Sequence, residues 1–237
     1  MDQSRKSTDL IHGGIAKSIF WFSIPLLIGN LFQQLYNTVD AYVVGNYVSK
    51  QALAAVGASS PITNMLIGFF MGLATGAGVV IAQYYGANDE KRLKQSVHSS
   101  AALTIVMAII LTIAGVILTN PLLHIIGIPA DVFPESSTYL TIYFGGITFA
   151  LIYNMGAGVL RAVGDSKRPL YFLVVACLTN IVLDLLLVKV FHMGVAGAAI
   201  ATDISQALSA FLVCVVLMRS HEVYALKVKK FVFIYRY

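Results

Sequence analysis

The chain has 237 residues, of which 58% are hydrophobic and only 11% are charged, and its mean hydropathy is +0.80. A soluble domain carries about 25% charged residues, so this composition excludes a soluble globular protein and indicates an integral membrane protein. The net charge of +5 does not indicate nucleic-acid binding, because the basic residues lie between apolar runs, where they set membrane topology.

Six apolar runs of spanning length use nearly the whole chain and predict an all-α integral membrane protein, a bundle of six transmembrane helices. We expect these spans at residues 17–47, 53–85, 97–119, 137–160, 170–190 and 195–218. Residues 1–16 are expected to form a cytoplasmic lead-in, residues 17–218 the transmembrane lobe, and residues 219–237 a basic cytoplasmic tail. No cleavable signal peptide is expected, because the first run is too long and no small-residue cleavage site follows it.

The first span carries polar groups that are unusual in a membrane helix: Asn30, Gln33, Gln34, Asn37 and Asp40. Such groups are costly in hydrocarbon and persist only where they face protein or water. Pro25, earlier in the span, can bend the helix and free a backbone carbonyl. For the two glutamines, simple bonding to neighbours and a functional role are about equally favoured. Asp40 is the stronger functional candidate, because an intramembrane carboxylate marks an ion or substrate pathway by default.

The next two spans indicate packing rather than chemistry. In the second span, we expect Pro61 and Asn64 to break the start of the helix. Gly68, Gly72, Gly76 and Gly78 follow, the first three at intervals of four, and predict a face on which another helix packs closely. The third span is nearly pure aliphatic and is expected to face lipid. Residues 120–134 contain three prolines and are expected to form a loop.

The last three spans again carry polar side chains. In the fourth span, Tyr153 and Asn154 lie deep enough to make inward polar contacts. In the fifth, Asn180 and Asp184 are four residues apart and therefore share a helix face. The sixth contains Thr202, Asp203, Ser205 and Gln206. The two cysteines, Cys177 and Cys214, each fall inside an apolar run and are expected to be small buried residues rather than disulfide or metal ligands.

The distribution of the sixteen Lys and Arg residues predicts the orientation of the spans. Lys50 and Lys189 fall on one side of the membrane. The other side receives Arg5, Lys6, Lys17, Lys91, Arg92, Lys94, Arg161, Lys167, Arg168, Arg219, Lys227, Lys229, Lys230 and Arg236. A division of fourteen to two predicts that this side, with both termini, is cytoplasmic. The expected location is the plasma (inner) membrane.

This topology places polar groups from three spans at one depth. Asp40, Asp184 and Thr202 each lie about seven residues from the outer end of their span, which is roughly 10 Å below the surface at 1.5 Å per residue. Two carboxylates with Asn and Thr oxygens suit a hard cation such as Na⁺, and they equally suit a proton carrier. A hydrogen-bonded polar plug is the structural alternative, which we disfavour because two acids without a basic partner hold a bundle together poorly.

Five stretches, taken in order, carry a family resemblance: PLLIGNLFQQLYNTVDAYVVG, ALAAVGASSPI, AQYYGA, LRAVGDSKRP and GVAGAAIATDISQ. Each is weak alone, but together they resemble the multidrug and toxic compound extrusion (MATE) family, closer to its bacterial and archaeal DinF-like branch. The resemblance covers about residues 15–230. It matches the amino-terminal six-helix lobe of a transporter that normally has twelve spans in two lobes.

The resemblance implies efflux of organic, often cationic compounds, driven by Na⁺ or H⁺ and without a cofactor. It implies that the coupling ion binds at Asp40, Asn180, Asp184 and Thr202. It also makes four residues secondary candidates for the cavity: Tyr36, Asn37, Tyr139 and Asn154. Asp203 lies outside the pattern and receives no role. The implied partners are small organic substrates and the lipid bilayer, with no nucleic acid.

One departure from the family pattern leaves alternatives open. The sequence offers no second lobe, so we expect either a half-transporter that pairs with itself, or a truncated, non-transporting membrane protein or interaction partner that assembles with another lobe and retains only the ion site. A related lipid-linked flippase is disfavoured, because the only charges expected at depth are acidic. An enzyme is not expected, since no Ser–His or Cys–His pair shares a depth and no His or Cys metal cluster occurs.

Overall fold

The computed structural model describes residues 15–220 and 223–226, and within these residues the regular structure is entirely helical. The elements are α1 (Ile15–Tyr47), α2 (Lys50–Gly86), α3 (Glu90–Ile126), α4 (Phe133–Ala162), α5 (Lys167–Asp184), the π-helix η1 (Leu185–Val190) and α6 (Gly194–Arg219). With α5 and η1 counted together, six helices are long and apolar enough to cross a membrane. This confirms the predicted six-helix fold. Nearly all of the expected lead-in, and most of the expected tail, lie outside the described residues.

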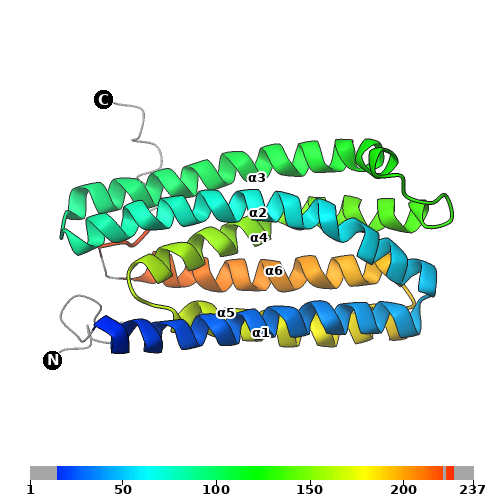
Figure 1. Ribbon diagram of the computed structural model, residues 1–237, viewed down its shortest axis with the longest axis horizontal. Helices are drawn as coiled ribbons and strands as arrows, with labels where there is room; N and C mark the ends of the chain where they lie inside the picture. Colours follow the sequence, from blue (N-terminus) through cyan, green and yellow to red (C-terminus); the bar gives the residue numbers. More distant parts are fainter. Residues whose placement is uncertain (1–14, 221–222, 227–237) are drawn as a thin grey trace.

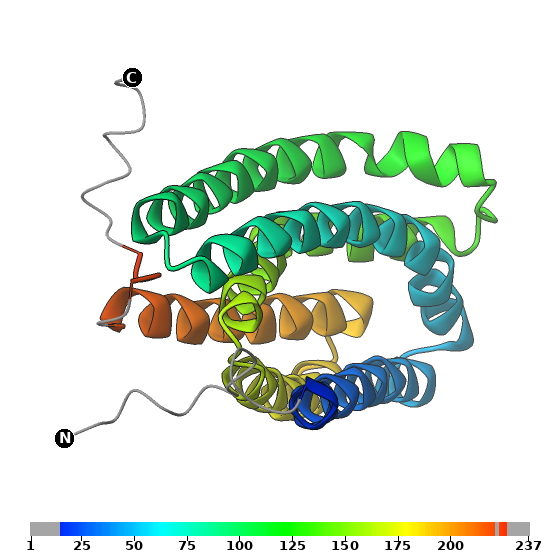
Figure 2. The same ribbon diagram turned by 60° about the vertical axis from the view of Figure 1, so that its left-hand side comes forward.

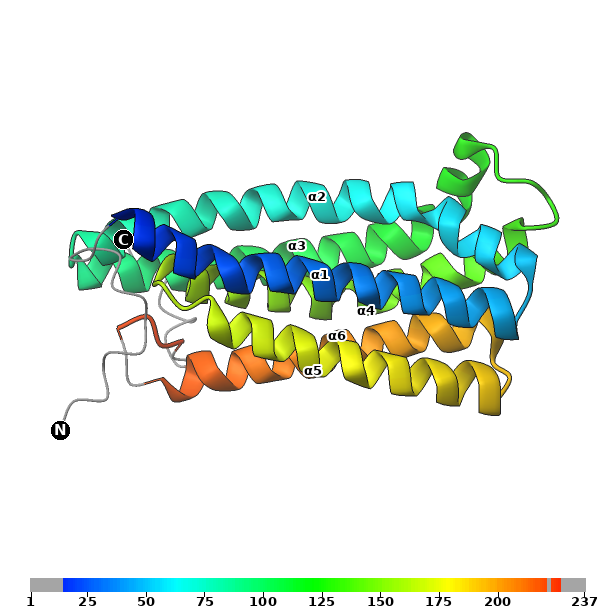
Figure 3. The ribbon, with the colours of Figure 1, turned by 60° about the horizontal axis from the view of Figure 1, so that its bottom comes forward.

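Short connections make helices that follow one another in sequence run antiparallel. Figure 1 shows α1 and α5 along one side of the bundle and α2 and α3 along the other, with α4 and α6 between them. α1 and α2 are joined at one end of the bundle, which we name the Tyr47 end. α1 begins and α6 ends at the opposite end, which we name the Arg161 end (Figures 1 and 3). Turning the bundle shows that α1 and α2 diverge toward the Arg161 end (Figure 2).

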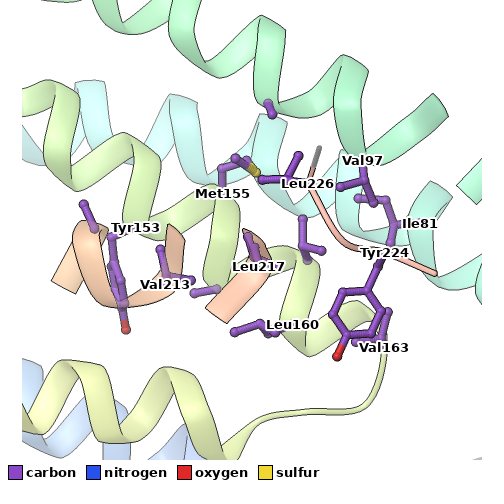
Figure 4. Packing of buried hydrophobic residues seen from close by; sticks show 14 of the residues in the cluster. Ile81, Val97, Tyr153, Met155, Leu160, Val163, Val213, Leu217, Tyr224 and Leu226 are labelled. Carbon is purple, nitrogen blue, oxygen red and sulfur yellow. The ribbon is translucent and has the colours of Figure 1, made fainter. Parts of the chain in front are cut away.

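The packed core of the Arg161 end centres on α4 and α6 and also includes Ile81 of α2 and Val97 of α3 (Figure 4). Val213 and Leu217 of α6 pack against α4 at Gly156, where an added Cβ would lie 2.7 Å from Val213 Cγ2. The segment after α6 closes this core, because the Leu226 N–H donates to the Leu217 carbonyl at 3.0 Å. Burying these aliphatic side chains fixes the distance between the two central helices, which in turn carry several of the predicted site residues.

Two further apolar clusters fix the remaining helices. One joins α2, α3 and α4 around Phe144, which lies so close to Gly115 that an added Cβ there would be 2.5 Å from the Phe144 ring. The other joins α1, α2, η1 and α6 at the Tyr47 end: Val43, Val44, Ala52, Val188, Val195 and Ala198. Thus α1 is packed firmly at the Tyr47 end, beside the predicted ion-site residues.

The prediction of a loop at residues 120–134 was wrong. α3 continues through Pro121 to Ile126 and ends at Gly127, whose φ of 76° lies in the left-handed region that favours glycine. α3 also begins earlier than expected, because the Asp89 side chain caps the helix by accepting from the Arg92 N–H at 3.0 Å. The connection to α4 is therefore only residues 127–132. Nor does α2 break at Pro61, since it runs unbroken from Lys50 to Gly86.

Three of the four α2 glycines predicted to form a packing face contact no other helix among the described residues, so this face has no partner helix there. A Cβ added at Gly68, Gly72 or Gly76 would meet no atom within 4 Å. The fourth, Gly78, lies at ordinary contact distance from α4, since an added Cβ would be 3.9 Å from the Gly158 carbonyl oxygen. The small-residue face of α2 is therefore open.

Candidate functional site

A cavity of about 640 Å³ runs between α1 and α2, with walls from α4, α5 and α6. Its volume lies within the range of about 300–1,000 Å³ that small-molecule sites occupy. α1 contributes one stripe of residues at helical spacing: Pro25, Leu26, Gly29, Asn30, Gln33, Tyr36, Asn37, Asp40 and Ala41. A continuous helix places every third or fourth residue on one face, so this single stripe lines the cavity over about half the length of α1.

The four predicted ion-site residues occupy two layers. Asp40 and Thr202 line the cavity and are 6% and 4% exposed. Asn180 and Asp184 lie behind the cavity wall on one face of α5, and both are fully buried. The carboxylates of Asp40 and Asp184 are close enough to interact electrostatically across the wall. The structure therefore places one layer at the cavity wall and a second, fully buried layer behind it.

Tyr36 joins the two layers. It lies one turn before Asp40 on α1, is buried, and also lines the cavity. Its hydroxyl lies beside that of Thr202 and within electrostatic range of Asp40 and Asp184. The two hydroxyls face each other but do not meet the geometry of a hydrogen bond, and both remain without a partner.

Polar atoms without hydrogen-bond partners are concentrated at this point. Among the described residues, nine buried side-chain nitrogen or oxygen atoms lack a partner, and seven of them belong to one group. We call this group the unsatisfied cluster: Tyr36, Asp40, Asn180, Asp184 and Thr202. Buried polar atoms are nearly always hydrogen-bonded, so a cluster of buried polar atoms without partners indicates a candidate ligand-binding site.

No basic side chain neutralises the cluster in the described part of the chain. The three ion pairs found there all join exposed or partly exposed residues in or beside the turns between helices at the Arg161 end. Lys189, the nearest basic residue in sequence, instead places its ammonium 4.9 Å from the centre of the Tyr47 ring. The two carboxylates therefore need a cation or protons from outside these residues.

The donor set decides which cation fits. Two carboxylates, an amide oxygen and two hydroxyls are hard oxygen ligands, which suit Na⁺ and other hard cations. No group of three His, Cys, Asp or Glu side chains that could hold a metal ion occurs in the ranges described. The same carboxylates can carry protons. The arrangement therefore places hard oxygen donors at the wall of a cavity large enough for an organic molecule.

Comparison with known proteins now identifies the family. The family model described as MatE matches residues 25–186. The chain belongs to the MatE family. This confirms the resemblance seen in the sequence. MatE members are transporters rather than enzymes, and the six spanning helices make this chain a multi-pass membrane protein.

Relatives and solved structures agree with this assignment. The chain is 35% identical to "Probable multidrug resistance protein YpnP" of Bacillus subtilis, over 86% of this chain and 46% of that protein. It is 23% identical to "Multidrug export protein MepA" of Staphylococcus saprophyticus, over 88% of this chain and 46% of that protein.

A solved transporter of the MOP superfamily from Pyrococcus furiosus matches with a TM-score of 0.89 and 28% identity, over 97% of this chain and 51% of that one. A second structure, titled as an outward-facing MATE transporter of the same superfamily, matches with a TM-score of 0.88 and 27% identity over the same shares. The chain spans about half the length of each of these relatives and structures. It therefore has the fold of one lobe of a MatE transporter.

The secondary candidates of this MatE chain separate into two groups. Tyr139 is buried, lines the cavity and lies within electrostatic range of Asp40, while Asn37 is exposed on the cavity wall one turn from it. Asn154 also lines the cavity, but toward the Arg161 end, where its amide donates to the Ala150 carbonyl at 2.8 Å. The structure thus brings two of these three candidates near the unsatisfied cluster and separates the third from it.

Several cavity residues were missed in the sequence. Ser60, Asn64 and Gln206 line the cavity, and the spacing of four from Thr202 to Gln206 and from Ser60 to Asn64 was the available signal. Arg161 also lines the cavity, although in the sequence it served only as a topology charge. Asp203 does not line it, because its carboxyl group packs against Gly146 of α4.

Proposed function

We propose that this MatE chain is the ion-coupling lobe of a secondary antiporter, which exports organic, often cationic compounds in exchange for Na⁺ or H⁺. The observation that carries the proposal is the unsatisfied cluster, with its two unpaired carboxylates, at the wall of a 640 Å³ cavity. The names of the relatives, multidrug resistance and multidrug export proteins, support the substrate class.

The two layers of the cluster supply a mechanism for exchange. The coupling ion enters from the cavity, meets Asp40 and Thr202 first, and completes its ligand shell with Asp184 and Asn180 behind the wall. An organic cation in the cavity is attracted by the same Asp40 carboxylate. Because one carboxylate cannot be neutralised fully by both, each ligand weakens the binding of the other, and this reciprocal coupling is what exchange requires.

Alternating access requires a second body against which this lobe can move. We propose that a second six-helix lobe, or a second copy of this chain, supplies it. The open small-residue face of α2 supports this proposal, because such faces allow another membrane helix to approach closely. The proposed orientation places the Arg161 end in the cytoplasm, as the distribution of Lys and Arg predicts.

The test measures Na⁺ binding to the purified chain in detergent by titration calorimetry. We expect a saturable signal that Asp40→Asn and Asp184→Asn abolish while circular dichroism shows intact helices. Asp203→Asn is the matched control, because it makes the same chemical change one residue from Thr202 but outside the cavity, and it should retain binding. Undiminished Na⁺ binding in both Asp40→Asn and Asp184→Asn would show that the ion site lies elsewhere.

Transport is tested separately in liposomes loaded with a fluorescent cationic dye. Dye movement under an imposed Na⁺ or H⁺ gradient would identify the coupling ion and show that the chain works with copies of itself. Na⁺ binding without dye movement would support the alternative that this chain alone is a non-transporting lobe with an intact ion site.

A further inference from the structure

A second, smaller groove opens beside the main cavity toward the Arg161 end. It has a volume of about 310 Å³ and lies between α1, α2 and α4. Its lining is almost entirely apolar and includes Phe22 of α1 and Met71, Ala74, Val79 and Ala82 of α2. Met71, Asn154 and Arg161 line the main cavity as well, so the groove is a side branch of the cavity wall.

Arg161 is the one charged residue in the lining of this groove. It is half-buried, and its Nε donates to the Ala157 carbonyl of its own helix at 3.1 Å. None of the ion pairs in the described ranges includes it, whereas Arg92, Lys94 and Arg168 each pair with an acid. A guanidinium has five donors in a planar fork that matches a phosphate group. The remaining donors of Arg161 therefore suit a phosphate in the groove.

The length of the groove fits one half of a bilayer. Along α2 the lining runs from Ala82, near the Arg161 end, to Met71, eleven residues deeper. At 1.5 Å per residue this is a rise of about 16 Å, about half of the ~30 Å hydrocarbon thickness of a membrane. Arg161 lies in the last turn of α4, where lipid headgroups are expected. One acyl chain can thus follow the groove while the headgroup meets the arginine.

We propose that this groove binds an anionic phospholipid, with the phosphate on Arg161 and one acyl chain along Met71, Ala74 and Val79. The charge of the arginine selects an anionic headgroup over a zwitterionic one, and the apolar walls select a lipid over a soluble phosphate. The bound lipid borders the main cavity and forms part of its side wall. This site is independent of the ion site, because none of its residues belongs to the unsatisfied cluster.

The single tryptophan of the chain lies next in sequence to a residue of this groove. Trp21 is 58% exposed on α1 and directly precedes Phe22, which lines the groove. Bromine atoms on lipid acyl chains quench tryptophan fluorescence on contact. The chain is therefore reconstituted in vesicles of phosphatidylcholine mixed with increasing fractions of brominated phosphatidylglycerol, and in parallel with brominated phosphatidylcholine. The ratio of the two quenching curves gives the preference for the anionic lipid at Trp21.

We expect the wild-type chain to prefer the anionic lipid about fivefold, as one basic residue near a membrane surface contributes. Arg161→Gln should reduce this preference to about onefold. Lys167→Gln is the matched control, because it removes the same charge from an exposed residue near the same end but outside the groove. It should keep the preference. Equal losses in both variants, or an unchanged preference in Arg161→Gln, would overturn the proposal.

A second variant tests the groove with the arginine intact. Thr75 is exposed and lines the groove, so Thr75→Phe should fill it and reduce quenching by the anionic lipid toward the level of the zwitterionic one. Unchanged quenching in Thr75→Phe would contradict an acyl chain in the groove, even if Arg161→Gln failed to fold.

Discussion

Similar polar side chains lie in or behind the cavity wall at its two ends, but they differ in hydrogen bonding. Toward the Arg161 end, the Tyr153 hydroxyl donates to the Pro169 carbonyl at 3.0 Å and the Asn154 amide donates to the Ala150 carbonyl at 2.8 Å. Toward the Tyr47 end, the Tyr36 hydroxyl and the Asn180 amide have no partner. A tyrosine and an asparagine are therefore structural at one end and available to a ligand at the other.

The comparison shows that residue type does not identify a transport site. The Tyr153 hydroxyl and the Asn154 amide are already hydrogen-bonded to backbone carbonyls, so these groups stabilise the helices they belong to. The unsatisfied cluster gains no such bonds, and its burial costs free energy until a ligand arrives. This free-energy cost of burial distinguishes a ligand-binding site from polar side chains that are hydrogen-bonded within the core.

The largest expected effect is the loss of stabilisation by sodium when Asp184 is replaced, which would show that the partnerless residues bind the ion. In wild-type protein, Na⁺ at one hundred times its dissociation constant should stabilise the fold by about 2.7 kcal/mol. For a chain of this size this raises the melting temperature by about 5–10 °C. Asp184→Asn should lose the sodium-dependent rise, and in sodium-free buffer it should melt no lower than wild type, because a buried unpaired charge has been removed. Melting is followed by circular dichroism in detergent, with potassium as the ionic-strength control.

A matched pair of tyrosine changes tests the comparison directly. Tyr153→Phe removes a made hydrogen bond and should lower the free energy of unfolding by about 1 kcal/mol, with sodium affinity unchanged. Tyr36→Phe removes a hydroxyl that has no hydrogen-bond partner. It should leave stability unchanged in sodium-free buffer while lowering sodium affinity several-fold. If both variants lost stability equally, the distinction between the two ends would be wrong.

The smallest effect is expected at Asn154. Its amide bonds within its own helix and it is only half-buried, so Asn154→Ala should change sodium affinity by less than about twofold and stability by about 0.5 kcal/mol. Titration calorimetry and thermal melting, run beside Asn180→Ala, measure the difference. A loss of sodium affinity at Asn154 as large as that at Asn180 would place the ion site elsewhere in the cavity.

Much of the fold and of the candidate site could be predicted from the sequence. Long apolar runs specify helices, and the rise per residue alone brings Asp40, Asp184 and Thr202 to one depth. The division into layers could not be predicted, because it depends on how each helix is rotated about its axis. Packing sets that rotation: Gly146 lacks a side chain, so Asp203 packs against α4 while its neighbour Thr202 lines the cavity.

The ends of the helices were the least predictable feature. Apolarity fades near Pro121 and before Val97, so hydropathy alone shortened α3 at both ends. Its true limits come from single local interactions, the capping bond of Asp89 and the left-handed backbone of Gly127. Likewise, glycine spacing on α2 indicated a packing face, but only the neighbouring helices decide whether that face is covered.

The two-residue connection between α1 and α2 has a mechanical consequence. Val48 and Ser49 leave the joined ends no room to separate, and the Ser49 side chain is itself held by the Ala52 N–H at 2.9 Å. A change in the angle between α1 and α2 would therefore pivot about the Tyr47 end. α1 has 33 residues and is about 50 Å long, so a tilt of about 10° at the hinge shifts its far tip by about 9 Å. Asp40 lies seven residues from Tyr47, so the same tilt would move it by only about 2 Å. Because α1 packs on Leu170 and Leu173 of α5 at Gly29, such a tilt would have to carry α5 along or break this contact.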